Sequence, residues 1–399
     1  MLERPTYLEA ALKWAAKPLI KVITGIRRSG KSVILRQRLR ALAEVHQGTA
    51  RSNVLIDMEL LENDALRSAT AIHTQLAALP PGDLLIDEVQ YVDQWERLAA
   101  SKLAEGWDVW VTGSNAHLLS SDLATHLTGR YVELPVWPLG LTEFSALRAM
   151  NGGEGDPLPS FLEWGGLPGL HAIGFDSGMA REYLHAVFDS ILLKDVVSRF
   201  AVRNVALLQR LATFVATTIG SPLSALSIAK FLKSQRLPVT ADTIQAYLHH
   251  LESAFLVARV PRWDLRGKRV LEVGEKVYLG DTGFFQALLG RAGDINAVLE
   301  NLVFLELRRR GCRVYTGRYD EFEVDFVAER DGQRTYLQVA YLLADPGTVA
   351  REVRPLERID DNYPKLVLSL DPHPPALPNG LLHAPLSAFL RGASPAGGA

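Results

Sequence analysis

The chain has 399 residues, enough for two or three domains, and its formal net charge is −2. This charge balance excludes a uniformly basic nucleic-acid binder, but it allows a local basic patch. The single cysteine, Cys312, excludes a disulfide framework and a thiolate metal cluster. Because no apolar run approaches membrane-spanning length and the first residues lack a leader pattern, we expect a cytoplasmic protein without a membrane segment.

Between about residues 17 and 146, short apolar runs alternate with helical patterns. This alternation predicts the α/β class, with a parallel sheet that is covered by helices. We expect one P-loop ATPase domain of the AAA+ type over residues 1–150. The predicted strands are residues 19–23, 53–57, 84–87, 109–112 and 131–134.

The first predicted strand is followed by Gly-Ile-Arg-Arg-Ser-Gly-Lys-Ser at residues 25–32, which is the spacing of a phosphate-binding P-loop. In such a loop, backbone N–H groups and the N-terminus of the next helix surround phosphates. We expect Lys31 to contact the β- and γ-phosphates of ATP and the Ser32 hydroxyl to bind Mg²⁺. The predicted nucleotide-binding residues are Gly25, Ile26, Arg27, Arg28, Ser29, Gly30, Lys31, Ser32 and Val33.

Two carboxylates, Asp87 and Glu88, end the third predicted strand. In a P-loop ATPase the first carboxylate at this position holds Mg²⁺ and the second orients the attacking water, so we assign Asp87 to the metal and Glu88 to the water. A buried strand that merely ends in a charged turn is the alternative. The fourth strand ends near Ser114 and Asn115, which are candidates for reporting the γ-phosphate, unless they form a plain turn.

Arg130 directly precedes the fifth predicted strand. It is either a solvent-facing charge at a turn or an arginine that reaches a γ-phosphate, in its own or in a neighbouring subunit. The action on a neighbouring subunit would require a homo-oligomer.

A Gly- and Pro-rich stretch at residues 151–159 begins a predicted helical lid or linker, residues 151–203. Residues 204–285 then give three helical patterns followed by two strands, the order of a winged helix, and Thr240 is a good N-cap for the third helix. If DNA binds, the third helix would enter the major groove and the hairpin tip would meet phosphates. Docking of a protein partner is the alternative use of this module. The candidate DNA-contacting residues are Arg266, Lys268 and Arg269.

Residues 286–391 predict a helix containing Glu300 and then strands, one of which carries Asp325. This order resembles a restriction-nuclease core, the PD-(D/E)XK type, in which carboxylates bind Mg²⁺ and a lysine steadies the attacking water. The nuclease triplet Glu-x-Lys reads Gln338-Val-Ala340 here, so we expect a degenerate site without cleavage, in which Glu300 and Asp325 still hold a weak cation. Residues 392–399 are predicted to be a disordered tail.

Together these motifs resemble a family of bacterial and archaeal AAA+ ATPases that join an N-terminal ATPase domain to a C-terminal domain of unknown function. The resemblance implies ATP binding, slow hydrolysis and a degenerate nuclease-like C-terminal region. Ser32 stands where relatives often have threonine, which preserves the Mg²⁺-binding hydroxyl, and Gln338 matches the usual glutamine of the family. The segments that carry the resemblance are residues 23–32, 86–92, 95, 111–115, 127–130, 164–168, 323–327 and 337–339.

The function that these expectations favour is an ATPase, converting ATP and water to ADP and phosphate, that couples its nucleotide state to DNA binding or remodelling. The alternative is a nucleotide-dependent switch or scaffold that docks a protein partner and never touches DNA. Salt dependence separates the two, because the affinity of a protein that neutralises DNA phosphates falls steeply with added salt.

Overall fold

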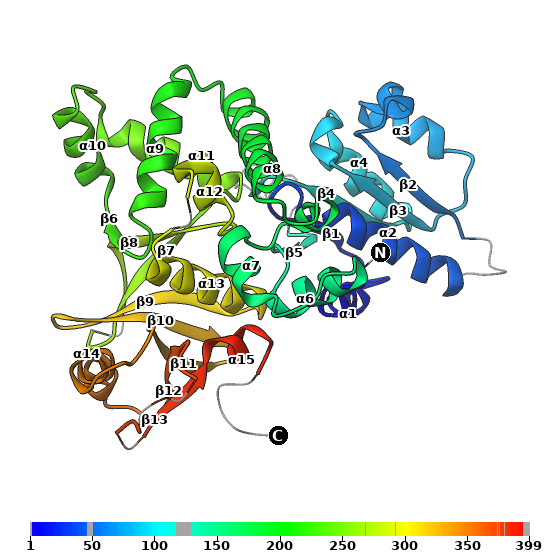
Figure 1. Cartoon of the computed structure of the whole chain (residues 1–399). Coiled ribbons are helices and arrows are strands. Elements are labelled where there is room, and N and C mark those ends of the chain that lie inside the picture. Colours follow the sequence, from blue (N-terminus) through cyan, green and yellow to red (C-terminus); the bar gives the residue numbers. More distant parts are fainter. Residues whose placement is uncertain are drawn as a thin grey trace. The chain divides into compact units, whose positions relative to one another are not determined.

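The structure is a computed structural model, shown in Figure 1. It describes residues 2–45, 51–116, 129–267, 269–291, 293–372, 374, 376–378 and 380–393. The chain divides into two compact units, Met1–Val136 with Ser253–Phe255, and Trp137–Glu252 with Leu256–Ala399.

The first unit contains a five-stranded sheet in the order β2-β3-β4-β1-β5, and every neighbouring pair is parallel. This sheet confirms the predicted α/β class, and each predicted strand is present with its ends within one residue. The strands are β1 (Ile20–Thr24), β2 (Asn53–Asp57), β3 (Asp83–Asp87), β4 (Asp108–Gly113) and β5 (Tyr131–Pro135).

Helices cover both faces of this sheet because the side chains of each strand alternate between two apolar clusters (Figure 1). Val22 packs in one cluster with residues of α3 and α4, whereas Ile23 packs in the other with Ala11 of α1 and Ile34 of α2. The helices are α1 (Pro5–Trp14), α2 (Lys31–Val45), α3 (Ala69–Leu76) and α4 (Trp95–Ala104), with the 3₁₀ turns η1 (Leu61–Leu66) and η2 (Val89–Tyr91).

The second unit begins with helices, and the lid or linker role predicted for residues 151–203 stays a prediction. In this segment α8 continues without a break into the π-helical turns of η5. Among the described residues, no helix combines the length and apolar character needed to cross a membrane. The helices of this unit are α6 (Leu141–Met150), α7 (Leu158–Trp164), η4 (Pro168–Ala172), α8 (Ser177–Ser190), η5 (Ile191–Ser198), α9 (Val205–Thr217), α10 (Ala225–Ser234), α11 (Ala241–Ser253), α12 (Phe284–Leu289), α13 (Ile295–Arg309), α14 (Pro346–Glu357) and α15 (Leu386–Leu390).

The same unit holds one mixed sheet of eight strands, in the order β13-β12-β11-β10-β9-β7-β8-β6. Its hairpin β7/β8 joins the later strands because β7 pairs in parallel with β9 around Trp263. The sheet therefore contains strands from both sides of residues 285–286, where we predict a boundary between two modules. That subdivision stays a prediction. The strands are β6 (Pro222–Leu223), β7 (Val257–Asp264), β8 (Arg269–Leu279), β9 (Arg313–Tyr319), β10 (Phe322–Arg330), β11 (Gln333–Val339), β12 (Lys365–Ser369) and β13 (Leu381–Pro385).

Three helices, α9 to α11, precede the hairpin in the order that the sequence predicts. Thr240 is confirmed as the N-cap of α11, since its hydroxyl oxygen accepts a hydrogen bond from the Thr243 N–H at 3.2 Å. The short strand β6, which pairs with β8, was not among the predicted elements. Assignment of these elements to a winged helix stays a prediction.

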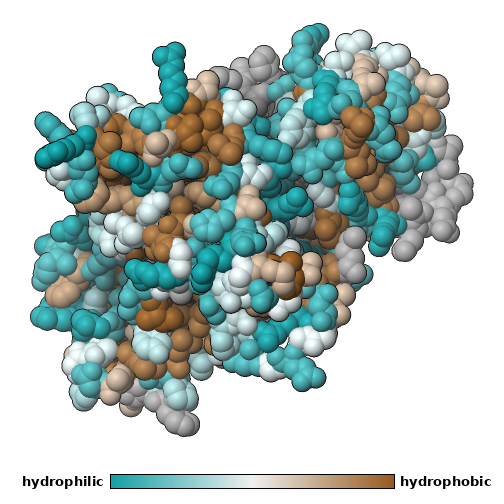
Figure 2. Space-filling view, turned by 45° about the horizontal axis from the view of Figure 1, so that its top comes forward, coloured by the Kyte–Doolittle hydropathy of each residue, from teal (hydrophilic) through white to brown (hydrophobic). Residues whose placement is uncertain are grey.

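Some large apolar side chains reach the surface of the second unit. On α10, Leu226 is 57% exposed and Phe231 is 44% exposed. Figure 2 shows brown apolar side chains lying among teal hydrophilic ones on the face that it displays. Scattered exposure of this kind is normal for folded proteins, so we assign no partner to it.

Candidate nucleotide-binding site

The loop between β1 and α2 has the backbone shape that the P-loop spacing predicts. Gly25 and Gly30 have φ values of 142° and 100°, a region that side chains with a Cβ rarely adopt. A Cβ on Gly25 would also lie 2.1 Å from the carbonyl oxygen of Val136, just after β5. Gly25 is therefore required both by its own conformation and by the close passage of another segment.

Lys31 is the first residue of α2, and its side chain is turned back onto the loop. The ammonium donates hydrogen bonds to the carbonyl oxygens of Gly25 at 3.0 Å and Ile26 at 3.1 Å. It also lies 3.9 Å from the Glu88 carboxylate and is almost completely buried. The lysine and the predicted water-orienting carboxylate thus belong to one site.

Asp87 and Glu88 are held by a single side chain from the neighbouring strand, Thr112 of β4. The parallel register pairs Ile86 with Val111, so the next residues, Asp87 and Thr112, lie side by side. The Thr112 hydroxyl donates to the Asp87 carboxylate and accepts a hydrogen bond from the Glu88 N–H at 2.9 Å. One hydroxyl therefore fixes the side chain of the first residue and the backbone of the second.

The Glu88 carboxylate lies in a buried polar pocket. It accepts a hydrogen bond from the Gln90 amide, and the Ser114 hydroxyl lies 3.4 Å away. Burial raises the pKa of Glu88, and the positive charges of Lys31 and Arg27 oppose this rise. A carboxylate with a raised pKa is a stronger base, which suits a group that accepts a proton from water.

Two side chains from outside the loop, those of Arg4 and Glu59, contact it. The Arg4 guanidinium, which is buried, donates to the Ser29 carbonyl oxygen at 3.0 Å, and Arg27 pairs with Glu59 at 3.1 Å. The Ser29 hydroxyl is buried and has no hydrogen-bond partner within the described residues. Three features fit a bound phosphate group: a loop with two glycines at positive φ, a helix that starts at a lysine, and a buried hydroxyl without a hydrogen-bond partner.

The structure brings most of the predicted nucleotide-site residues into this one region. Ser32 is half-buried in the first turn of α2, and Asn115 is fully buried just after β4. The roles that we assign to them stay predictions. Sequence reasoning missed Arg4 and Thr112, and only the pairing of β3 with β4 would have pointed to Thr112.

Arg130 does not belong to this region. Its carbonyl oxygen accepts a hydrogen bond from the Ile20 N–H, at the start of β1, whereas the phosphate loop follows the other end of that strand. The two positions are separated by the length of β1, roughly 15 Å, which exceeds the reach of an arginine side chain. Arg130 is exposed and is not placed to contact a nucleotide on its own chain. A role in a neighbouring subunit stays a prediction.

Of the candidate DNA-contacting residues, Arg266 and Arg269 lie at the tip of the β7/β8 hairpin, and each is paired with an aspartate. The Arg266 guanidinium lies 3.0 Å from the Asp320 carboxylate, and that of Arg269 lies 3.6 Å from Asp264. Both side chains are more than 70% exposed, so the pairs are weak. Lys268 lies outside the described residues.

In the C-terminal part, the predicted carboxylates Glu300 and Asp325 lie beside the same side chain, Lys276 of β8. The Lys276 ammonium is 3.0 Å from Glu300 and 3.7 Å from Asp325. Sequence reasoning missed this lysine, because it lies far from the nuclease-like triplet along the chain. Within the part of the chain that the structure describes, no group of three or more His, Cys, Asp or Glu side chains is arranged to hold a metal ion.

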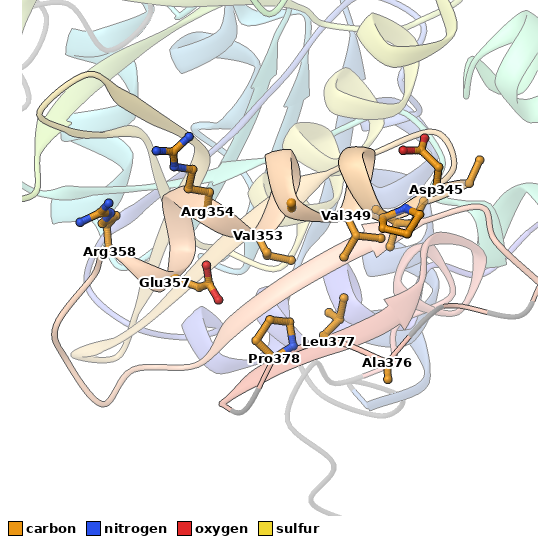
Figure 3. Close-up of a pocket in the computed structure, with 13 residues that line it drawn as sticks. Asp345, Val349, Val353, Arg354, Glu357, Arg358, Ala376, Leu377 and Pro378 are labelled. Atoms are coloured by element: carbon orange, nitrogen blue, oxygen red, sulfur yellow. The ribbon is translucent and has the colours of Figure 1, made fainter.

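A cavity of about 1010 Å³ lies in the second unit, between α14 and the segment around Leu377 (Figure 3). Val349 and Val353 point toward that segment, whereas Arg354 and Arg358 project away from it. None of the residues that line this cavity is a predicted site residue. We therefore treat it as separate from the nucleotide site.

A glycine-containing loop with P-loop spacing after β1, a pair of carboxylates at the end of β3 and a parallel sheet define a P-loop domain of the AAA type. A family model described as an AAA domain matches residues 17–145, and a second, described as a domain of unknown function (DUF8612), matches residues 156–294.

An uncharacterized protein of Haemophilus influenzae is 35% identical over 382 residues, which cover 92% of this chain and 93% of the relative. The uncharacterized protein MJ1544 of Methanocaldococcus jannaschii is 28% identical, covering 85% of this chain and 78% of the relative. The chain belongs to this family of bacterial and archaeal proteins, in which an AAA domain precedes the domain of unknown function.

Among solved structures, the chain is similar to the Walker-type ATPase PABY2304 of Pyrococcus abyssi. The TM-score is 0.52 and the identity is 15%, and the match covers 72% of this chain and 96% of the other. At this identity the likeness concerns the fold alone.

Proposed function

We propose that this protein binds ATP with Mg²⁺ and hydrolyses it to ADP and phosphate. The amides of the phosphate loop and Lys31 would bind the phosphates, while Ser32 and Asp87 would hold the metal ion. The metal would neutralise charge that develops on the phosphates during the reaction. Glu88 would orient the attacking water and accept its proton, and Asn115 would report whether the γ-phosphate is present.

The arrangement of Thr112, Asp87 and Glu88 carries this proposal. A charged turn without a function would not need one buried hydroxyl to fix both carboxylate residues, with the Glu88 carboxylate 3.9 Å from the loop lysine. Catalytic groups must be held in position before the substrate arrives, because disorder at the site raises the barrier.

The test is Glu88→Gln, which keeps the shape of the side chain and removes its basicity. We expect the variant to bind ATP as the wild type does and to hydrolyse it at least about 100-fold more slowly. Glu62→Gln, at an exposed glutamate of η1, is the matched control. Hydrolysis by Glu88→Gln at the wild-type rate would show that Glu88 is not the base.

For the second unit we propose coupling of nucleotide state to DNA through a winged helix built from α9–α11 and the hairpin. The order of the helices, the N-cap at Thr240 and the exposed arginines Arg266 and Arg269 support this proposal. Each arginine that neutralises a phosphate should contribute about 0.9 to the slope of log affinity against log salt on duplex DNA. Arg266→Ala should make the fall of log affinity with log salt less steep by about that amount. Arg330→Ala, at an exposed arginine that ends β10, should leave the steepness unchanged.

The alternative function is a nucleotide-dependent switch that docks a protein. It is favoured by the pairing of both hairpin arginines with aspartates. It is also favoured by His250 of α11, the helix that would enter the groove, because the ring of this half-buried side chain stacks on Phe200 at 4.0 Å. ATPase rates with duplex, branched and single-stranded DNA separate the two proposals. Stimulation by one form supports DNA coupling, and a rate indifferent to all three, without salt-sensitive binding, supports the switch.

If Arg130 acts on a neighbouring subunit, the protein must assemble to hydrolyse ATP. Mixing inactive Lys31→Ala with inactive Arg130→Ala would then restore part of the activity, because the first variant supplies an intact arginine to the second variant's intact phosphate loop. Arg97→Ala, at an exposed arginine of α4, is the control for the loss of surface charge. An active Arg130→Ala variant would remove this residue from the mechanism.

A further inference from the structure

Lys276 lies at the point where three carboxylates meet in the second unit. Its ammonium is 3.0 Å from Glu300 of α13, 2.6 Å from Glu323 and 3.7 Å from Asp325, the last two on β10. The lysine side chain is 2% exposed. We call Glu300, Glu323 and Asp325 the carboxylate centre.

The members of the carboxylate centre are oriented by further contacts. The Tyr278 hydroxyl donates to the Glu300 carboxylate, and the Val339 N–H donates to Asp325 at 2.9 Å. A Cβ on Gly220 would lie 2.6 Å from the same glutamate, so the backbone there closely covers it. The convergence on Lys276 is therefore built by several elements and does not rest on one flexible side chain.

Two irregularities in the sheet flank the carboxylate centre. The register between β9 and β10 shifts between Val324 and Val327, around Asp325, and the register between β7 and β8 shifts just after Val260, the partner of Lys276. Bulges of this kind bend a strand and redirect its side chains, and they are common beside functional sites.

The carboxylate centre is open to solvent on one side. Glu323 is 40% exposed, and it lines a cavity of about 570 Å³ together with Gln338 and Glu352. A hydrated metal ion therefore has a path to these oxygens. However, the place where the three carboxylates converge is already occupied by the positively charged ammonium of Lys276.

The charges explain why the lysine stays ionised in a buried place. Burial lowers the pKa of Lys276, but the three carboxylates more than offset this effect and raise it. For Asp325, burial and the Glu300 charge raise the pKa, although Lys276 opposes the rise. One ammonium thus balances only part of the negative charge around it.

We propose that Lys276 is the resident cation of the carboxylate centre and that its ammonium occupies the position a divalent metal ion would otherwise take. With the ammonium in place, the three carboxylates are not arranged as a metal site. Without it, their oxygens would have to close to the distances of about 2.3 to 2.6 Å at which hard cations such as Ca²⁺ are bound. The ammonium satisfies them without a metal and makes entry of a second cation unfavourable. The carboxylates then serve to hold β8, α13 and β10 together.

The test replaces the ammonium by a neutral side chain of similar length in the full-length protein. Lys276→Met leaves the carboxylate centre without its cation, so we expect the variant to gain one terbium ion per chain, which Ca²⁺ displaces. Tyr278 lies beside the site and serves as the antenna for terbium luminescence. The wild type and the matched control Lys102→Met, at a lysine that is also buried and paired with a glutamate, should gain no such ion.

Adding Asp325→Asn to Lys276→Met should abolish the new terbium site. It should also raise the thermal midpoint above that of Lys276→Met alone, because it removes a carboxylate that has lost its counter-charge. If Lys276→Met folds only when Ca²⁺ is present, the rescue supports the proposal as well.

Three results would overturn the proposal. The first is terbium binding to the wild type that Asp325→Asn removes, since metal and lysine would then coexist. The second is a folded Lys276→Met variant that binds no terbium or Ca²⁺. The third, which does not require the single variant to be stable, is a double variant that is no more stable than Lys276→Met.

Discussion

Thr112→Val is the substitution that most directly probes how the two carboxylates of the nucleotide site are held. It preserves the shape of a fully buried side chain and deletes only the hydroxyl. Two hydrogen bonds disappear with it, the one donated to Asp87 and the one accepted from the Glu88 N–H. Neither partner is placed to turn to water, because Asp87 and Glu88 are both more than 90% buried.

The magnitude follows from these two losses. A hydrogen bond to a charged group contributes about 1.5 to 3 kcal/mol, and a buried N–H left without a partner costs about 1 to 3 kcal/mol. Partial relaxation around the gap reduces their sum, so we expect Thr112→Val to lower the free energy of unfolding of the first unit by about 2 to 4 kcal/mol. Loss of the fixed Glu88 backbone should also lower the turnover number at least about tenfold, which corresponds to about 1.4 kcal/mol of barrier.

The assay is urea unfolding followed by tryptophan fluorescence, combined with steady-state ATPase rates at saturating ATP. Thr112→Ser keeps the hydroxyl and is the matched control, so it should retain most of the turnover number. If Thr112→Val unfolds at the wild-type urea concentration and hydrolyses ATP at the wild-type rate, Thr112 does not hold these residues and the reasoning is wrong.

Three other substitutions test further features of the fold and site. Gly25→Ala should abolish ATP binding, measured by calorimetry, because the new Cβ would lie 2.1 Å from the Val136 carbonyl oxygen and displace the loop. Retained affinity for ATP would show that the loop tolerates a side chain at this position. Burial raises the pKa of Asp281 to about 7, so its protonated form is favoured on folding, and the resulting stability is present below about pH 4 and lost as the pH rises through 7. Asp281→Asn should flatten this pH dependence, worth up to about 4 kcal/mol, in urea midpoints between pH 4 and 8. Lys21→Met should cost about 3 to 5 kcal/mol by leaving Asp108 buried without its partner, and a loss below about 1 kcal/mol would refute this.

The five strands of the first unit could be predicted because each of them gives a local pattern in the sequence. Strands buried on both faces appear as short continuous apolar runs, and polar residues mark their ends. The phosphate loop and the pair Asp87–Glu88 also depend on neighbours in sequence. Thr112 escaped prediction because its role depends on which strand lies beside β3, and β4 is separated from β3 by a whole helix.

Arg130 shows the limit of the same reasoning. The Gly-Arg pair at residues 129–130 suggests an arginine that reaches a phosphate. The sequence does not show whether this residue lies at the end of the strands where the phosphate loop lies or at the opposite end. The pairing of Ile20 with Tyr131 decides this, because it places Arg130 at the start of β1. Strand register is a tertiary property, and it excludes the contact within one chain that the residue type allowed.

The second unit was less predictable because its sheet is assembled from distant segments. β7 pairs with β9 across two helices, and β6 consists of only two residues. β12 and β13 have no counterpart among the predicted elements. Short strands are held by their neighbours more than by their own residues, so their patterns are weak.

Lys276 shows why a degenerate motif is a poor guide to the chemistry that replaces it. Comparison with a nuclease triplet reveals that Ala340 has no ammonium, but not that β8 brings one to the same carboxylates. A lysine ammonium has three N–H donors, and three carboxylates lie within 3.7 Å of this one. Glu300 and Glu323 lie within hydrogen-bond distance of this ammonium, whereas Asp325, at 3.7 Å, interacts with it through charge alone. Under our proposal, this positive charge holds β8, α13 and β10 together.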